Sequence, residues 1–85
     1  MKITLRFFAS VREALGTSQE TVQLPAEVRT VGSVRDLLIA RGGVWASALA
    51  HDNSLRMAVN HGMCGPETEI AEGGEVAFFP PVTGG

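Results

Sequence analysis

The chain has 85 residues, of which 45% are hydrophobic, and its formal net charge is −2. This length fits a single domain, the hydrophobic content is too high for a disordered chain, and the charge provides no basic surface for nucleic acid or an anionic membrane. No apolar run reaches the ~20 residues of a membrane span, and the single cysteine excludes an internal disulfide and suits a reducing, cytoplasmic location.

The first predicted element is a strand over residues 2–8, KITLRFF. Ile3, Leu5 and Phe7 alternate there with polar residues, as in a strand that buries one face. The intervening polar residues also interrupt the apolar region that a signal peptide needs.

Residues 10–16, SVREALG, predict a short helix. Ser10 and Glu13 have the spacing of a capping box, and Gly16 favours an end of the helix at that point. A second strand is predicted in residues 21–24, TVQL, which has one apolar face. The two strands therefore form a hairpin whose connection contains the helix.

The main helix is predicted in residues 30–43, TVGSVRDLLIARGG. Thr30 or Ser33 can cap its start, and Gly42 and Gly43 end it. Its buried stripe, at spacings of three and four, comprises Val31, Val34, Leu37, Leu38 and Arg41.

The second half of the chain returns to strands. Trp45 and Leu49 are one turn apart and predict a short helical segment, with Trp45 in the core. Alternation in residues 55–60, LRMAVN, predicts a third strand, and Ile70 is expected in a short connecting strand. A last strand is predicted in residues 75–79 after a Gly-Gly turn. These elements predict a two-layer α+β domain.

The interior of the sequence contains no evident catalytic constellation. Cys64 has no second cysteine and no obvious histidine partner, which favours an incidental thiol. His51 and His61 lack metal-ligand spacing, so no metal site is predicted. The glycine pairs at residues 42–43 and 73–74 lack the following Lys-Ser/Thr of a phosphate loop.

The carboxyl end, FFPPVTGG, is the most informative stretch. We expect a domain in residues 1–79 followed by a stiff, extended tail in residues 80–85, because prolines and β-branched residues favour extension. The tail residues are Pro80, Pro81, Val82, Thr83, Gly84 and Gly85. The final glycines place no side chain beside the carboxylate, which can enter a narrow channel. Such a carboxylate can react with ATP to form an acyl-adenylate, from which a sulfur donor or an amine displaces AMP.

An exposed aromatic patch is predicted at the root of this tail. Alternation places Phe8 and Phe79 on the outer face of the first and last strands. These two strands are usually neighbours in the sheet of a domain with this order of elements. Met63, expected in a loop after the third strand, extends the patch. An apolar patch beside a functional tail indicates a partner surface. The alternative is that one of the rings turns inward against the short helix.

The chain resembles the small subunits of molybdopterin synthase, which are ubiquitin-like β-grasp sulfur carriers, over its whole length. The resemblance rests on FFASVREALG, TVGSVRDLLIARGGVWASALA, AVNHGM and, most specifically, EGGEVAFFPPVTGG. It implies that a ubiquitin-activating-like adenylyltransferase consumes ATP to adenylate Gly85, which is then converted to a thiocarboxylate. It also implies that the chain binds no cofactor and contributes no catalytic side chain of its own to the sulfurtransferase complex.

The same resemblance implies the partners. The tail inserts into the large subunit, whose active site holds the pterin precursor, within a heterotetramer of two small and two large subunits. Phe8, Met63 and Phe79 match the hydrophobic interface of the family. Leucine is common at the position of Met63, and Cys64 matches no functional position.

Three other functions fit parts of the sequence. A sulfur carrier of thiamine synthesis has the same fold and tail chemistry, but such chains are usually shorter and lack FFPPVTGG. A protein modifier is a second alternative, although Lys2 is the single lysine and leaves almost no acceptor for chain building. A β-grasp interaction domain with an inert end is the third, and the tail sequence argues against it.

Overall fold

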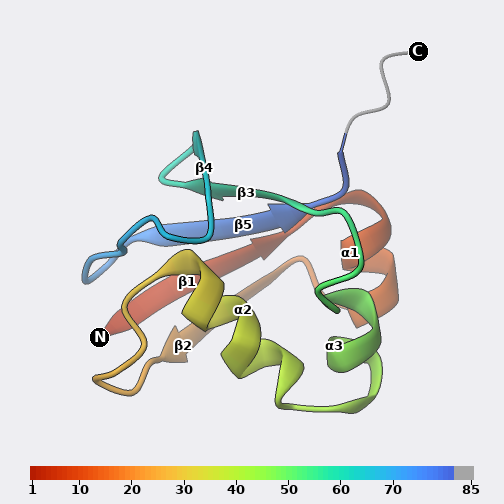
Figure 1. The fold of residues 1–85 in the computed structure, drawn as a ribbon, viewed down its shortest axis with the longest axis horizontal. Coiled ribbons are helices and arrows are strands. Elements are labelled where there is room, and N and C mark those ends of the chain that lie inside the picture. Colours follow the sequence, from red (N-terminus) through yellow and green to blue (C-terminus); the bar gives the residue numbers. More distant parts are fainter. Residues whose placement is uncertain (82–85) are drawn as a thin grey trace.

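The computed structural model describes residues 1–81, which form one mixed sheet and a set of short helices (Figure 1). The strands are β1 (Lys2–Phe7), β2 (Gln19–Gln23), β3 (Arg56–Val59), β4 (Gly62–Cys64) and β5 (Glu75–Phe79). The helices are α1 (Ala9–Leu15), α2 (Val31–Ile39) and α3 (Gly43–Ala48). Among these described residues, no helix has the length and apolar character needed to cross a membrane.

The two ends of the described chain meet in the middle of the sheet. The strand order is β2-β1-β5-β3-β4, and β1 and β5 are parallel whereas the other neighbours are antiparallel. Phe7 is in register with Phe78, and Arg6 is in register with Ala77. Residues in register share a face of the sheet, so this pairing separates an inner face from an outer face. The expected adjacency of the first and last strands is confirmed.

The core lies between the inner face of the sheet and the helices, which cover that face in Figure 1. The rings of Phe7 and Phe78 are fully buried and stack with their centroids 6.4 Å apart. Half-buried Trp45 packs its ring edge-on against Phe7 at 5.6 Å, as expected for a core residue of the second helical segment.

Helix α1 starts differently from the sequence expectation. The Ser10–Glu13 capping box does not form, because the N-cap is Phe8, which has an extended backbone and makes no side-chain cap. Ser10 consequently lies inside the first turn, where its hydroxyl cannot cap the helix. The expected end is confirmed: Gly16 has a φ of 73° and its N–H donates to the carbonyl of Arg12.

Helix α2 is capped by Thr30, whose hydroxyl accepts from the N–H of Ser33 while the Ser33 hydroxyl accepts from the N–H of Thr30. The helix ends at Ile39, which is earlier than expected, so Arg41 does not belong to the buried stripe. Arg41 instead forms an ion pair with Glu20 at 2.6 Å, and this hydrogen bond raises the pKa of the guanidinium.

Residues 62–64 form strand β4 in place of the loop that the sequence predicts. Met63 is in register with Ala58, and Cys64 is in register with Met57. The tight turn at Asn60 and His61, both at positive φ, directs the chain back along β3.

The expected short strand at Ile70 is absent from the described residues. The neighbouring Glu69 forms only an isolated bridge with Thr30. Ile70 is nevertheless buried, and its N–H donates to the carbonyl of Arg29 at 2.9 Å. The apolar character of Ile70 is therefore explained by its burial in the core and not by a position in a strand.

Candidate functional site at the carboxyl end of strand β5

Phe8 and Phe79 lie side by side where strand β5 ends. Their ring centroids are 6.3 Å apart and the rings meet edge to face at 84°. Phe8 is 38% exposed and Phe79 is half-buried. Both follow an inward-facing phenylalanine, so alternation places them on the outer face, away from the helices. The alternative that a ring turns inward does not apply.

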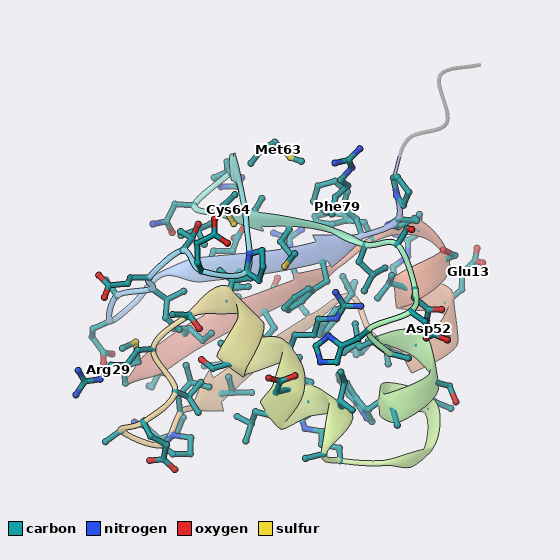
Figure 2. All side chains as sticks on the ribbon, in the orientation of Figure 1. Glu13, Arg29, Asp52, Met63, Cys64 and Phe79 are labelled. Atoms are coloured by element: carbon teal, nitrogen blue, oxygen red, sulfur yellow. The ribbon has the colours of Figure 1, made fainter. Side chains whose placement is uncertain are left out.

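Met63 lies on the same outer face. It is in register with Ala58 on β3, which is in register with Ala77 on β5, two residues before Phe79. Met63 is 64% exposed, and Figure 2 shows Met63 and Phe79 on the side of the sheet opposite α2. We call Phe8, Met63 and Phe79 the outer-face patch. The structure thus brings all three sequence-predicted residues to one face.

Two arginines border the outer-face patch. The Arg6 guanidinium lies 5.3 Å from the centre of the Phe8 ring and 3.7 Å from the carboxylate of Glu75. Arg56 is in register with Phe79 and therefore belongs to the same face. A partner that covers this face therefore meets apolar rings flanked by Arg56 and by the Arg6–Glu75 ion pair.

The first residues of the expected tail follow directly on β5. Pro80 and Pro81 are half-buried and lie outside any strand. Val82, Thr83, Gly84 and Gly85, to which the sequence assigns the remaining tail and the reactive carboxylate, lie outside the described residues. The boundary between a domain of residues 1–79 and a tail of residues 80–85 stays a prediction.

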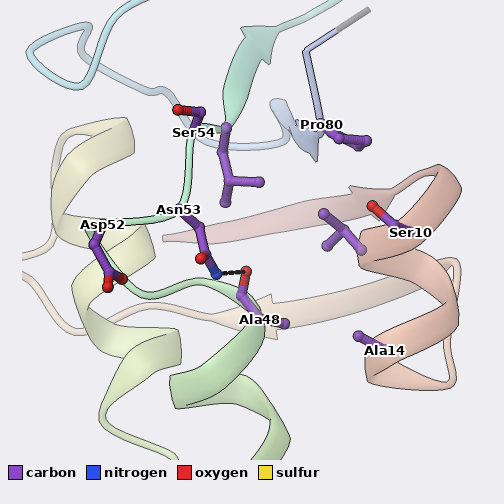
Figure 3. A pocket seen from close by; sticks show the side chains of 9 residues that line it. Ser10, Ala14, Ala48, Asp52, Asn53, Ser54 and Pro80 are labelled. Atoms are coloured by element: carbon purple, nitrogen blue, oxygen red, sulfur yellow. Dashed lines mark hydrogen bonds between the residues drawn. The ribbon is translucent and has the colours of Figure 1, made fainter.

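A hollow of about 420 Å³ lies beside Pro80, between α1 and the loop that precedes β3 (Figure 3). Ser10, Val11 and Ala14 of α1 form one wall, and residues 52–55 of the loop form the opposite wall. Sequence reasoning missed this hollow because its lining comes from segments that are far apart in the chain and carry no recognisable motif.

Arg35 fixes the loop that borders the hollow. This residue of α2 is only 7% exposed, and its Nε donates to the carbonyl of Leu49 at 2.7 Å. A terminal nitrogen donates to the carbonyls of Ala50 and Asn53. Burial lowers the pKa of the guanidinium, and the nearby carboxylate of Asp36 partly offsets this shift. Nothing in the sequence indicates this role, because an arginine in an amphipathic helix is normally expected at the surface.

Cys64 and the two histidines do not form a reactive or metal-binding group. Burial raises the pKa of the half-buried Cys64 thiol, with a smaller opposing effect of its hydrogen bond to Thr68. His51 pairs with Asp36 at 2.6 Å, whereas His61 lies near Glu75, so the two histidines occupy different sites. Within residues 1–81, no three side chains of His, Cys, Asp or Glu gather as metal ligands.

The ThiS family matches residues 5–85. The molybdopterin synthase sulfur carrier subunit of Escherichia coli (strain K12) is 42% identical over 83 residues, which cover 98% of this chain and 99% of that protein. The chain belongs to the ThiS family. The resemblance to the small subunits of molybdopterin synthase, found in the sequence, is thereby confirmed.

Solved structures support the fold of this ThiS-family chain. The putative molybdopterin converting factor subunit 1 from Pyrococcus furiosus superposes with a TM-score of 0.78 at 23% identity, over 96% of this chain and 99% of that chain. A protein–protein complex of subunits 1 and 2 of the molybdopterin-converting factor from Helicobacter pylori contains a similar chain, with a TM-score of 0.68, 17% identity and full coverage of both chains. The expected ubiquitin-like β-grasp fold is confirmed.

Proposed function

We propose that this ThiS-family chain is the sulfur-carrier subunit of a molybdopterin synthase. The observation that carries the proposal is the 42% identity, over nearly the full length of both chains, to a protein named as that subunit in Escherichia coli. The sulfur is carried by the carboxyl group of Gly85, the last residue of the sequence.

The carboxylate of Gly85 must be activated before a sulfur donor can attack it, because a free carboxylate is unreactive. One carboxylate oxygen of Gly85 attacks the α-phosphate of ATP on a ubiquitin-activating-like adenylyltransferase, and pyrophosphate leaves. A sulfur donor then attacks the acyl-adenylate, and AMP leaves with that oxygen. The product is a thiocarboxylate, which passes its sulfur to the pterin precursor held by the large subunit.

The described residues support a carrier whose own side chains do not catalyse the transfer. Cys64 is the single thiol, and its raised pKa keeps it protonated and poorly nucleophilic at neutral pH. This electrostatic environment disfavours the alternative in which sulfur is carried on the cysteine.

The outer-face patch supports docking of a protein partner next to the reactive end. Phe8 and Met63 are among the large exposed apolar residues, and Phe79 lies immediately before Pro80. An apolar surface at this position is expected to be covered by the large subunit and to direct the following residues towards its active site.

The proposal is tested by the intact mass of the protein after incubation with the activating enzyme, ATP and a sulfur source. We expect the mass change for replacement of one oxygen by sulfur, and peptide fragmentation should place the sulfur on Gly85. The variant Cys64→Ala should gain the same sulfur. Sulfur found only on Cys64, and lost in that variant, would refute the proposal.

A further inference from the structure

We propose that the outer face next to Pro81 carries a docking site for an aspartate or glutamate side chain of the protein that binds the carboxyl end, and that Arg56 binds this carboxylate. The inference rests on the proposed function, because the protein in question is the large subunit. It adds a charged contact to the apolar outer-face patch, and it assigns a negative charge to the partner surface that lies beside Pro81.

Arg56 lies at the edge of the outer-face patch. It is the first residue of β3 and is in register with Phe79 on β5, so the two side chains are direct cross-strand neighbours on the outer face. Beside them is a hollow of about 370 Å³, which is lined by Ser54, Leu55, Arg56 and Pro81. The site is therefore continuous with the patch on one side and with the residues that follow β5 on the other.

Arg56 is exposed, and its guanidinium forms no ion pair within residues 1–81. Arg6, the other arginine on the outer face of the strands, is paired with Glu75 at 3.7 Å. Asp52 lines the larger hollow beside Pro80 and not this one, and Figure 3 shows its carboxylate directed away from Pro80. The positive charge of Arg56 is therefore not balanced by a described carboxylate, and it attracts an anion.

The surroundings of Arg56 suit a carboxylate that belongs to a protein side chain. The planar guanidinium can form two parallel hydrogen bonds with a carboxylate. Leu55 and Pro81 supply apolar surface for the methylene groups that carry it, and the hydroxyl of Ser54 is a further donor. A phosphate site normally adds a helix start, a nest of backbone N–H groups or several cations. Among residues 1–81, Arg56 is the one charged residue that lines this hollow.

The backbone that carries Arg56 is fixed before a partner binds. Strand β3 lies between β4 and β5 in the sheet. The loop that precedes it is anchored at Asn53, whose carbonyl accepts a hydrogen bond from Arg35 at 3.1 Å. A segment that is already ordered loses little conformational entropy when a partner binds. The cost of forming the ion pair is therefore mainly that of ordering the Arg56 side chain.

The position of Arg56 gives the ion pair a role in orienting the partner. Interfaces commonly surround an apolar centre with a polar rim, and opposite charges in the rim speed the encounter and fix the register of the two surfaces. Arg56 and Pro81 line the same hollow. A carboxylate bound there places the large subunit next to the point at which the chain leaves β5, and it distinguishes this orientation from others that the apolar patch alone would allow.

The test measures association and dissociation of the large subunit from the same organism by surface plasmon resonance at several salt concentrations. Arg56→Gln removes the charge and keeps most of the length of the side chain, whereas Arg56→Glu reverses the charge. Arg29→Gln makes the same charge change as Arg56→Gln at an exposed position between β2 and α2, and it is the matched control. Circular dichroism and thermal unfolding verify that each variant is folded.

We expect Arg56→Gln to weaken binding about fivefold at low salt, mainly through slower association. Most of this difference should be lost near 1 M salt, where the Debye length is about 3 Å. Arg56→Glu should weaken binding further, and Arg29→Gln should change affinity less than about twofold. Wild-type affinity of Arg56→Gln at low salt, or a loss no larger than that of Arg29→Gln, would overturn the inference and leave the proposed function intact.

A second measurement tests the identity of the bound group. Each surface aspartate or glutamate of the large subunit is changed in turn to asparagine or glutamine, and each variant is titrated with the wild-type protein and with Arg56→Gln. We expect one of these variants to bind the wild-type protein more weakly and to cause no further loss with Arg56→Gln. Absence of such coupling at every position would show that Arg56 does not bind a carboxylate of the large subunit and would overturn the inference. If the wild-type proteins do not bind each other, the proposed function fails first, and the inference fails with it.

Discussion

At the scale of single residues, each of the two Phe-Phe pairs is divided between the core and the surface. Phe7 and Phe78 are fully buried, whereas Phe8 is 38% exposed and Phe79 is half-buried. The period of two along a strand produces this division, and the parallel register of β1 and β5 brings equivalent members of the pairs together. Identical side chains therefore have different roles. Phe7 and Phe78 stabilise the core, whereas Phe8 and Phe79 form part of the surface.

Because one phenylalanine of each consecutive pair is in the core and the other at the surface, mutations can test binding separately from folding. We expect Phe79→Arg to fold normally and to weaken binding to the large subunit by about 2 kcal/mol or more, which is about thirtyfold, because aromatic anchors dominate interfaces. Calorimetric titration measures the effect. Val44→Arg, at a 53% exposed position of α3, is the control and should bind like the wild type. Unchanged affinity of a folded Phe79→Arg protein would remove this ring from the interface.

At the scale of elements, the parts that could be predicted are those with a clear period. Strand β1 and helix α2 bury one face each, and their alternation or spacing appears directly in the sequence. Strand β4 could not be predicted, because three residues at a sheet edge with the burial pattern of two exposed and one half-buried position show no alternation. The predicted cap of α1 was wrong because the N-cap is Phe8, which directly follows strand β1, has an extended backbone and makes no side-chain hydrogen bond to the helix.

The candidate site was predictable to the same extent. The outer-face patch follows from strand alternation and topology, both of which the sequence contains. The hollow and the Arg35 contacts depend on how α1, α2 and the loop before β3 pack together. Local sequence patterns do not predict this packing. Arg35 illustrates this limit best. A charged side chain is normally expected at the surface, but Arg35 is buried because backbone carbonyl groups accept its hydrogen bonds.

Arg35 supplies a prediction about the stability of these elements. Arg35→Met should lower the free energy of unfolding by about 3 kcal/mol, because three carbonyl groups lose a charged donor in a poorly hydrated place. Urea unfolding followed by circular dichroism measures the change. Arg29→Met is the matched control, since Arg29 is exposed and its Nε makes one hydrogen bond to Ala26, and it should cost less than about 0.5 kcal/mol. Equal losses in both variants would show that the Arg35 contacts contribute little.

At the scale of the whole molecule, the sheet divides the protein into a face for stability and a face for contact. The helices cover the inner face (Figure 1), and the outer face carries the patch together with Arg6 and Arg56. The chain ends its last strand at the border of these regions. In the proposed function, the domain positions the carboxyl end, and the chemistry occurs at Gly85.

This separation of docking from chemistry predicts the effect of removing Gly85. The truncated protein should bind the large subunit with near-normal affinity, because the outer-face patch is unchanged. It should support almost no molybdopterin synthesis, because the new carboxylate is displaced by up to ~3.3 Å and a misplacement of ~1 Å can cost ~10²-fold in rate. Synthesis assays with purified components measure the product. Wild-type rates from the truncated protein would contradict the carrier role, and loss of binding would show that Gly85 also anchors the complex.

The parallel pairing of β1 with β5 has a consequence for how the protein is made. The strand synthesised first cannot complete its central position in the sheet until the strand synthesised last has left the ribosome. Phe7 and Leu5 keep an uncovered side until Phe78 and Val76 arrive, so a chain that stops before β5 leaves these two fully buried residues without their neighbours in the sheet. Nascent and prematurely terminated chains should therefore be recognised as unfolded and degraded. Only a chain that includes β5 presents a folded surface to an activating enzyme.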